Sequence, residues 1–390
     1  MRRLVGTLVV TLVVVALALI MGCGSTGNDP SESAAGKPQP PPAPVYTVTD
    51  MGASVSWGIM TPNAINDAGQ VAGSIGNGTV GSPCAWVWDG TPKGLPRLPN
   101  GEGGRASPGS GEGINSHGDV SGSAQGPKPG GWTLHPVIWV VDSSAPDGSG
   151  YTAFDLALGE AGATGKVTAI NTAHEAVGRQ GFEYADDGCV WTPTYGEDPN
   201  TPTGFVRTVA TGFGLRDIND NYQAGGGPGV WTVEPEVDPT SWIGSLIPVP
   251  SGAASATVWT VNDDGDAAGY LTNSDGKNGG AFVWLRETGT TVNAGMLAGC
   301  ASMAVLGINR DHVIVGRAST IPDRKGLSTS KGYVGKPVLT GGAITSYQLQ
   351  DLTTLAGIAV AEARAINNNG WIACQSTSST GYRPLLLQPK

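Results

Sequence analysis

Short apolar runs alternate along this chain with Gly, Pro, Asn and Asp. Runs of this length are typical of β-strands, and Gly, Asn and Asp favour the turns between strands. One ten-residue pattern occurs seven times, as AINDAGQVAG, GINSHGDVSG, AINTAHEAVG, DINDNYQAGG, TVNDDGDAAG, GINRDHVIVG and AINNNGWIAC. We interpret each copy as a strand, a hairpin turn and a second strand.

The third residue of every copy is Asn. An Asn side chain can bond the backbone that follows it, and a Gly three residues later supplies positive φ in four of the seven copies. The copies are 43 (219 to 262) to 58 (309 to 367) positions apart, so length varies only outside the core pattern. The seven residues are Asn66, Asn115, Asn171, Asn219, Asn262, Asn309 and Asn367.

A third strand follows each copy, and a fourth is visible in YTAFDL, SWIGSLIPV and SYQLQDL. The third strand carries Trp at one recurring position in five repeats, and Val334 and Leu386 replace this Trp in the last two repeats. In the other repeats this position holds Trp88, Trp139, Trp191, Trp231 and Trp284.

The two ends of the repeat array complement each other. The last repeat lacks a fourth strand, and VYTVTDMG at residues 45–52 precedes the first repeat. Pairing these segments would close a ring. We therefore predict an all-β fold, a seven-bladed β-propeller of four-stranded blades, closed by the N-terminal strand joining the last blade. An open β-solenoid and a propeller of six or eight blades are the alternatives.

The repeat core I-N-D-x-G-x-V-x-G is kept best at residues 65–73, and GAFVW stands at residues 280–284. This pattern resembles the bacterial extracellular HAF-repeat family, over nearly all of residues 45–390. The resemblance implies an exported, β-propeller-like protein and assigns no activity to particular residues. The His of the family's name is absent from every copy here.

The N-terminus has the features of an export signal. Arg2 and Arg3 precede an apolar run at residues 4–21, which ends in Ile-Met-Gly-Cys. This ending resembles a bacterial lipobox. We predict a signal peptide at 1–22, a lipidated Cys23 that begins a Pro/Gly/Ser-rich tether at 23–44, and one domain at 45–390. The protein would be exported and lipid-anchored to a bacterial membrane, at the outer membrane or cell surface. An uncleaved signal anchor is the alternative.

Composition narrows the class further. The 390 residues include 61 Gly and 28 Pro, which excludes a mainly helical fold, while 39% hydrophobic residues and 11 Trp are enough for a core. The net charge is −10, so we expect no nucleic-acid partner.

Candidate metal ligands are sparse. His117, His174 and His312 all fall in the hairpin turns and are expected to point away from one another, and His135 has no evident partner. The acidic run at residues 262–266 lacks the ligand spacing of an EF-hand and is interpreted as a turn. We predict no metal and no cofactor.

Catalytic and redox chemistry is equally sparse. Asp186 with Asp187, and Glu102 with Glu112, are the best carboxylate pairs for a glycosidase. Besides Cys23, the cysteines do not recur in register, so we expect small buried side chains, with one bridge left open. They are Cys84, Cys189, Cys300 and Cys374.

The variable loops are the expected binding surface, because uniform turns suit structure and variable loops suit recognition. The longest are predicted at residues 100–112, 123–135 and 319–331. We predict a monomeric, non-catalytic binding or scaffolding module for an envelope polysaccharide or envelope protein. An extracytoplasmic glycan hydrolase or lyase is the alternative. Trp132 is the expected anchor, unless it merely covers an edge, and the other candidates are Arg105, Lys128, Asp323 and Arg324.

Overall fold

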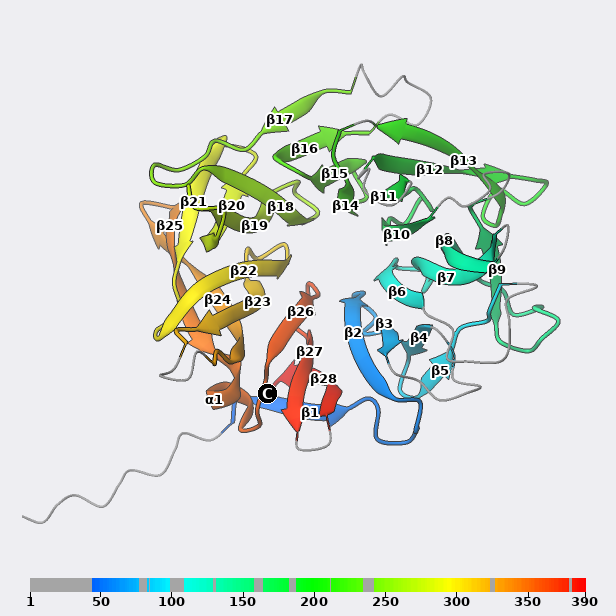
Figure 1. Ribbon diagram of the computed structural model, residues 1–390, viewed down its shortest axis with the longest axis horizontal. Coiled ribbons are helices and arrows are strands. Elements are labelled where there is room, and N and C mark those ends of the chain that lie inside the picture. The colour runs from blue at the N-terminus through cyan, green and yellow to red at the C-terminus, as the bar shows by residue number, and fades with distance from the viewer. Residues whose placement is uncertain are drawn as a thin grey trace, which may run out of the picture. The chain divides into compact units, whose positions relative to one another are not determined.

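The computed structural model describes residues 44–76, 83, 85–98, 109–128, 131–157, 164–181, 187–210, 212–233, 242–322, 327–378 and 381–390. Within residues 43–390, antiparallel sheets follow one another around a circle (Figure 1). The first strand of each repeat lies nearest the centre, and the fourth lies on the outside. The prediction of an all-β, β-propeller-like fold is therefore confirmed.

Five of the sheets in the described part of the chain have four strands each. They are β10 (Thr164–Ile170), β11 (Ala176–Gly181), β12 (Gly188–Tyr195) and β13 (Pro202–Ala210); β14 (Leu215–Ile218), β15 (Gln223–Gly226), β16 (Gly229–Thr232) and β17 (Gly244–Leu246); β18 (Ser255–Val261), β19 (Ala267–Thr272), β20 (Asn278–Leu285) and β21 (Thr290–Gly295); β22 (Cys300–Ile308), β23 (Ile314–Thr320), β24 (Ser330–Thr340) and β25 (Ala343–Asp351); and β26 (Glu362–Ile366), β27 (Ile372–Ser378), β28 (Gly381–Pro389) and β1 (Tyr46–Asp50).

The first two repeats share one eight-stranded sheet, so the expectation of seven separate four-stranded blades is wrong here. Strands β3 and β6 meet at a single residue pair, Ser74 and Ser110, and this pair is enough to join the two hairpin arrays. The strands are β2 (Ile59–Ile65), β3 (Val71–Gly76), β4 (Ala85–Trp88), β5 (Pro92–Gly94), β6 (Gly109–Ile114), β7 (Val120–Lys128), β8 (Gly131–Val141) and β9 (Tyr151–Asp155).

The N-terminal strand completes the last sheet, as predicted. β1 pairs antiparallel with β28 from Tyr46 opposite Pro389 to Asp50 opposite Leu385. The backbone N of Lys390 also donates to the carbonyl of Val45 at 3.0 Å. Without β1, the apolar strand β28 would be an open sheet edge.

The helix α1 (Leu352–Ala356) connects β25 to β26. It begins after Asp351, whose side chain accepts from the backbone N of Thr353, and it ends at Gly357 with φ 72°. No helix in the described ranges is long and apolar enough to cross a membrane.

The core lies between neighbouring sheets. One cluster packs Val283 of β20 against Val305 of β22 and Tyr333 of β24. Another joins the last repeat to the first through Leu386, Met60 and the fully buried Trp86. Neighbouring repeats therefore share their core side chains.

Several finer predictions need correction. In the first five repeats, the residue five after the Asn pairs with the Trp of the third strand. In the last two repeats its partner is Gly335 or Leu387, so these residues, not Val334 and Leu386, occupy the Trp position. The predicted loop at residues 123–135 is mostly a long hairpin of β7 and β8. Cys189, Cys300 and Cys374 are buried, as expected, and Cys84 lies outside the described residues.

Candidate functional site

The seven signature asparagines form a closed ring of hydrogen bonds, which we call the asparagine ring. The Nδ2 of each Asn donates to the backbone carbonyl of the Asn in the next repeat, and that of Asn367 donates to Asn66. In chain order the distances are 2.9, 3.1, 3.2, 2.8, 3.3, 3.2 and 2.9 Å. All seven side chains are buried.

The side-chain oxygen of each Asn accepts hydrogen bonds within its own turn. Every Oδ1 accepts from the backbone N four residues later, at 2.8 or 2.9 Å. The residue three after the Asn has positive φ in each turn, including the non-Gly residues His174, Tyr222 and His312. The sequence-based interpretation of this pattern as an Asn-stabilised hairpin turn is confirmed. Each Asn thus links its own turn to the next repeat.

Neighbouring turns also fit by shape. A Cβ on Gly69 would overlap the ring of Trp371, and a Cβ on Gly265 would overlap the amide of Gln223. At these two junctions, Gly three after one Asn leaves room for the side chain four after the previous Asn.

In two repeats the residue three after the Asn is His, and in both cases it contacts an Asp four after the Asn of the previous repeat. Asp119 Oδ2 accepts from His174 Nε2 at 3.0 Å, and Asp266 Oδ2 accepts from His312 Nε2 at 2.8 Å. Burial opposes ionisation of Asp119, but hydrogen bonds, first from His174, outweigh it and lower its pKa. The pKa of Asp266 is lowered in the same way, against burial, and its hydrogen bond raises the pKa of His312.

The histidine predictions need two corrections. The rings of His117 and His174 do not point apart: they stack at 5.4 Å, and Tyr195 contacts His174. His135 has a partner after all, because its Nδ1 lies 2.9 Å from Asp155. Spacing within the repeat could have revealed the turn contacts, since these residues come from adjacent copies.

A buried acid lies beside this histidine cluster. The side chain of Glu175 is 4% exposed. Its Oε2 has no hydrogen-bond partner among the described residues. Burial raises the pKa of Glu175 to about 7.

A second set of seven positions carries varied chemistry. Every innermost strand has a β-bulge three residues before its Asn, where the pairing register skips one residue. All seven residues are half-buried, and we call them the bulge ring. They are Asn63, Glu112, Thr168, Arg216, Trp259, Leu306 and Arg364.

Bulge-ring residues reach across to the neighbouring repeat. The guanidinium carbon of Arg216 lies 4.2 Å from the ring centroid of Trp259, and Arg364 donates to Asn63 at 3.1 Å. Glu112 forms an ion pair with Lys166 at 3.1 Å. The sequence reveals the varied residues at this position but not the bulge that groups them.

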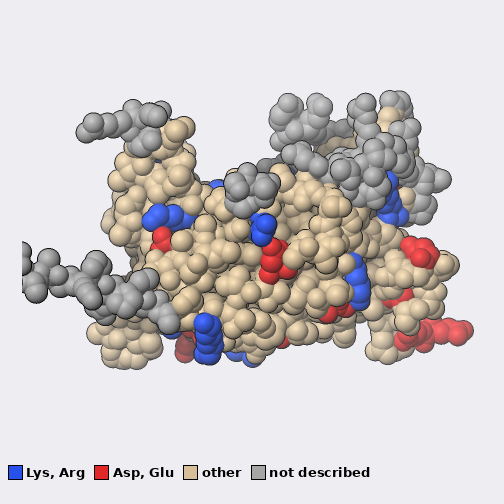
Figure 2. All heavy atoms as spheres, turned by 90° about the horizontal axis from the view of Figure 1, so that it is seen from below, with Lys and Arg blue, Asp and Glu red and all other residues tan. Residues whose placement is uncertain are grey.

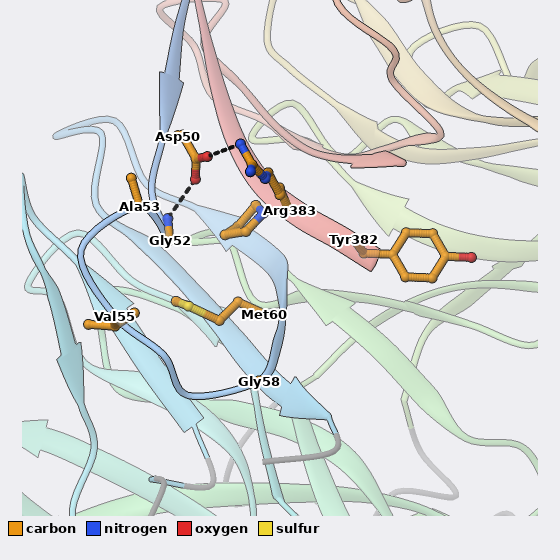
Figure 3. A pocket seen from close by; sticks show the side chains of 9 residues that line it. Asp50, Gly52, Ala53, Val55, Gly58, Met60, Tyr382 and Arg383 are labelled. Atoms are coloured by element: carbon orange, nitrogen blue, oxygen red, sulfur yellow. Dashed lines mark hydrogen bonds and ion pairs between the residues drawn. The ribbon is translucent and has the colours of Figure 1, made fainter. Parts of the chain in front are cut away.

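A pocket of about 280 Å³ lies where β1 joins the last sheet. Asp50 accepts from the backbone N of Gly52 at 3.0 Å and forms an ion pair with Arg383 at 3.2 Å, while Tyr382 points away from this pair (Figure 3). Both charged groups have partners, so this pocket offers no free acid or base.

Few of the predicted site residues can be placed. Trp132 is half-buried near the tip of the β7–β8 hairpin, opposite Pro127. Lys128 ends β7, and its side chain is not described. Glu112 is paired with Lys166, and Asp187 accepts from the backbone N of Gly212 at 3.3 Å. Outside the described residues lie Cys23, Glu102, Arg105, Asp186, Asp323 and Arg324.

Comparison with known proteins adds little. The sequence matches no protein-family model and no curated protein. Among solved structures it is similar to a puromycin-hydrolyzing peptidase of Mycobacterium tuberculosis, with a TM-score of 0.47 and 14% identity over 76% of this chain and 45% of that chain. The chain thus spans less than half of that peptidase, and a likeness at this level carries no argument about function.

Proposed function

We propose that this protein is an exported, lipid-anchored β-propeller that binds an envelope polysaccharide without changing it chemically. In this proposal the eight-stranded sheet counts as two blades joined at one residue pair, which makes seven repeats in all. The HAF-like repeat core and the lipobox-like ending at Cys23 support export and anchoring.

The bulge ring is the observation that carries the proposal. It presents one half-buried side chain per repeat, and its seven residues differ in chemistry. The asparagine ring gives all seven turns the same structure, so the residue type at the bulge-ring positions can differ without changing the fold. The Trp259 ring with Arg216 beside it offers a flat surface and nearby donors, which suit a sugar ring and its hydroxyls.

Trp132 is a second proposed contact, on the opposite rim. It precedes Trp139 by seven residues of one strand, or about 23 Å, and Trp139 pairs with Val120 directly after an asparagine turn. An aromatic side chain at a hairpin tip offers a large contact area at low ordering cost. Acidic and basic side chains both appear on the side of the molecule shown in Figure 2.

The alternative is a glycan hydrolase or lyase on the same frame. Three of the described acids near the two rings favour binding instead, because Asp119, Asp266 and Glu112 are each held in an ion pair or hydrogen bond across a repeat junction, and a fourth, Glu175, is buried. A general acid or base needs a group free to exchange its proton with substrate.

The test is capture of protease-treated envelope polysaccharide by the purified full chain in detergent. We expect Trp259→Ala and Trp132→Ala each to weaken capture about tenfold or more, with unchanged melting temperature. Tyr382→Ala, at the corresponding hairpin tip of the last repeat, is the matched control and should bind normally.

Unchanged capture by both Trp variants would contradict the proposal, and so would release of new reducing ends. Capture that disappears after protease treatment would favour the envelope-protein alternative.

A further inference from the structure

We infer that Asp264, Asp266 and His312 form a binding site for a divalent transition-metal ion. Each offers one ligand atom, and these three atoms lie within 4.8 Å of one another. The site lies at the asparagine turns and shares no residue with the proposed polysaccharide contacts at Trp259 and Trp132.

Two adjacent turns bring the three ligands together. Asp264 and Asp266 lie in the turn between β18 and β19, and His312 lies in the turn between β22 and β23 of the next repeat. The Oδ1 of Asp266 accepts from the backbone N of Arg286 at 2.8 Å, which directs Oδ2 toward His312. This outer contact orients the carboxylate before any ion binds.

The ligand chemistry favours Zn²⁺ over Ca²⁺ or Mg²⁺. One imidazole nitrogen and two carboxylate oxygens suit zinc, with a further position for water, whereas calcium and magnesium prefer oxygen ligands alone. Ligand atoms around tetrahedral zinc are about 3.3 Å apart, so the 2.8 Å contact between Asp266 and His312 needs to open only slightly. The ion would replace the hydrogen that these two groups share.

The equivalent three residues at another repeat junction do not bring three ligand atoms together. His117, Asp119 and His174 occupy the same three positions at the junction of the second and third repeats. There the two imidazole rings stack, and among the described residues only the Asp264 set brings three ligand atoms together.

The experiment is calorimetric titration of the full chain, in detergent and without a histidine tag, with ZnCl₂, CaCl₂ and MgCl₂. We expect one Zn²⁺ site that prefers zinc over both other ions. Asp264→Asn and His312→Gly should each weaken it at least about tenfold. Gly stands at the position of His312 in four other repeats, so this variant should fold.

His174→Gly is the matched control and should leave zinc affinity unchanged. Absence of a zinc site, equal affinity for calcium, or unchanged zinc affinity in Asp264→Asn and His312→Gly would overturn the inference.

Discussion

The Nδ2 of Asn367 lies 2.9 Å from the carbonyl oxygen of Asn66, across 301 positions of sequence. This bond has the same donor and acceptor as the six bonds between successive repeats. The first and last turns are therefore joined in the same way as any other pair, in addition to the β1–β28 pairing.

Removing one amide from the asparagine ring should destabilise the whole domain. Asn367→Ala leaves the backbone N of Trp371 without its partner and leaves the carbonyl of Asn66 with only its bond from Gly69, at a cost of about 1–3 kcal/mol. Urea unfolding measures this loss. The exposed Asn200 serves as control, and Asn200→Ala should change stability by less than about 0.5 kcal/mol. Equal effects of the two variants would contradict a structural role for the ring.

Close packing between turns makes a second prediction. Gly69 and Gly289 both have positive φ, but only a Cβ on Gly69 meets another side chain, that of Trp371. Gly69→Ala should therefore be less stable than Gly289→Ala by about 1–3 kcal/mol. Thermal unfolding of the two variants compares them directly, and similar midpoints would argue against the contact.

Closure by β1 can be tested by truncation. A chain lacking residues 1–50 loses β1 and exposes the edge of β28, so it should aggregate and melt at a lower temperature. A chain lacking residues 1–43 keeps β1 and should melt as the full chain does. Light scattering and calorimetry separate the two results, and identical melting of both truncations would show that β1 is dispensable.

Glu175 predicts a pH dependence of stability. Its pKa is about 7 in the fold against an ordinary value of 4.5, so the unfolded chain ionises first as pH rises. Stability should fall between these two pH values by up to about 3 kcal/mol. Glu175→Gln should remove this fall and be more stable than the parent at pH 8, while at pH 4 the difference should be small. Parallel pH profiles of the two proteins would refute the prediction.

Cys23→Ser tests the proposed lipid anchor. Loss of the thiol removes the acylation site, so the protein should leave the membrane fraction of cells. Mass spectrometry of the parent should show an acylated N-terminal Cys23. Retention of the Ser variant with its N-terminal Met1 would instead indicate an uncleaved anchor.

The sequence predicts the frame because the frame repeats. The Asn, its turn and the strands around it occur seven times, and β1 pairs with β28 because the last repeat lacks one strand. The Ser74–Ser110 contact that merges two sheets has no such signal, because one backbone pair depends on how neighbouring strands are placed.

The candidate sites were harder to predict for a related reason. A bulge adds one residue to a strand without any fixed residue type, so Arg216 and Trp259 show no common motif. Likewise, His312 meets Asp264 and Asp266 only because one turn lies beside the next. Comparing fixed offsets in adjacent copies would have brought these residues together.

The closed asparagine ring also limits how this protein can evolve. Successive asparagines are already 43 to 58 positions apart, because added residues do not disturb the bonds. A gene duplication that added one whole repeat would be different, since an eighth amide would have to enter a circle already closed between Asn367 and Asn66. A change in repeat number would therefore have to break and remake this closing bond, while insertions within a repeat leave it intact.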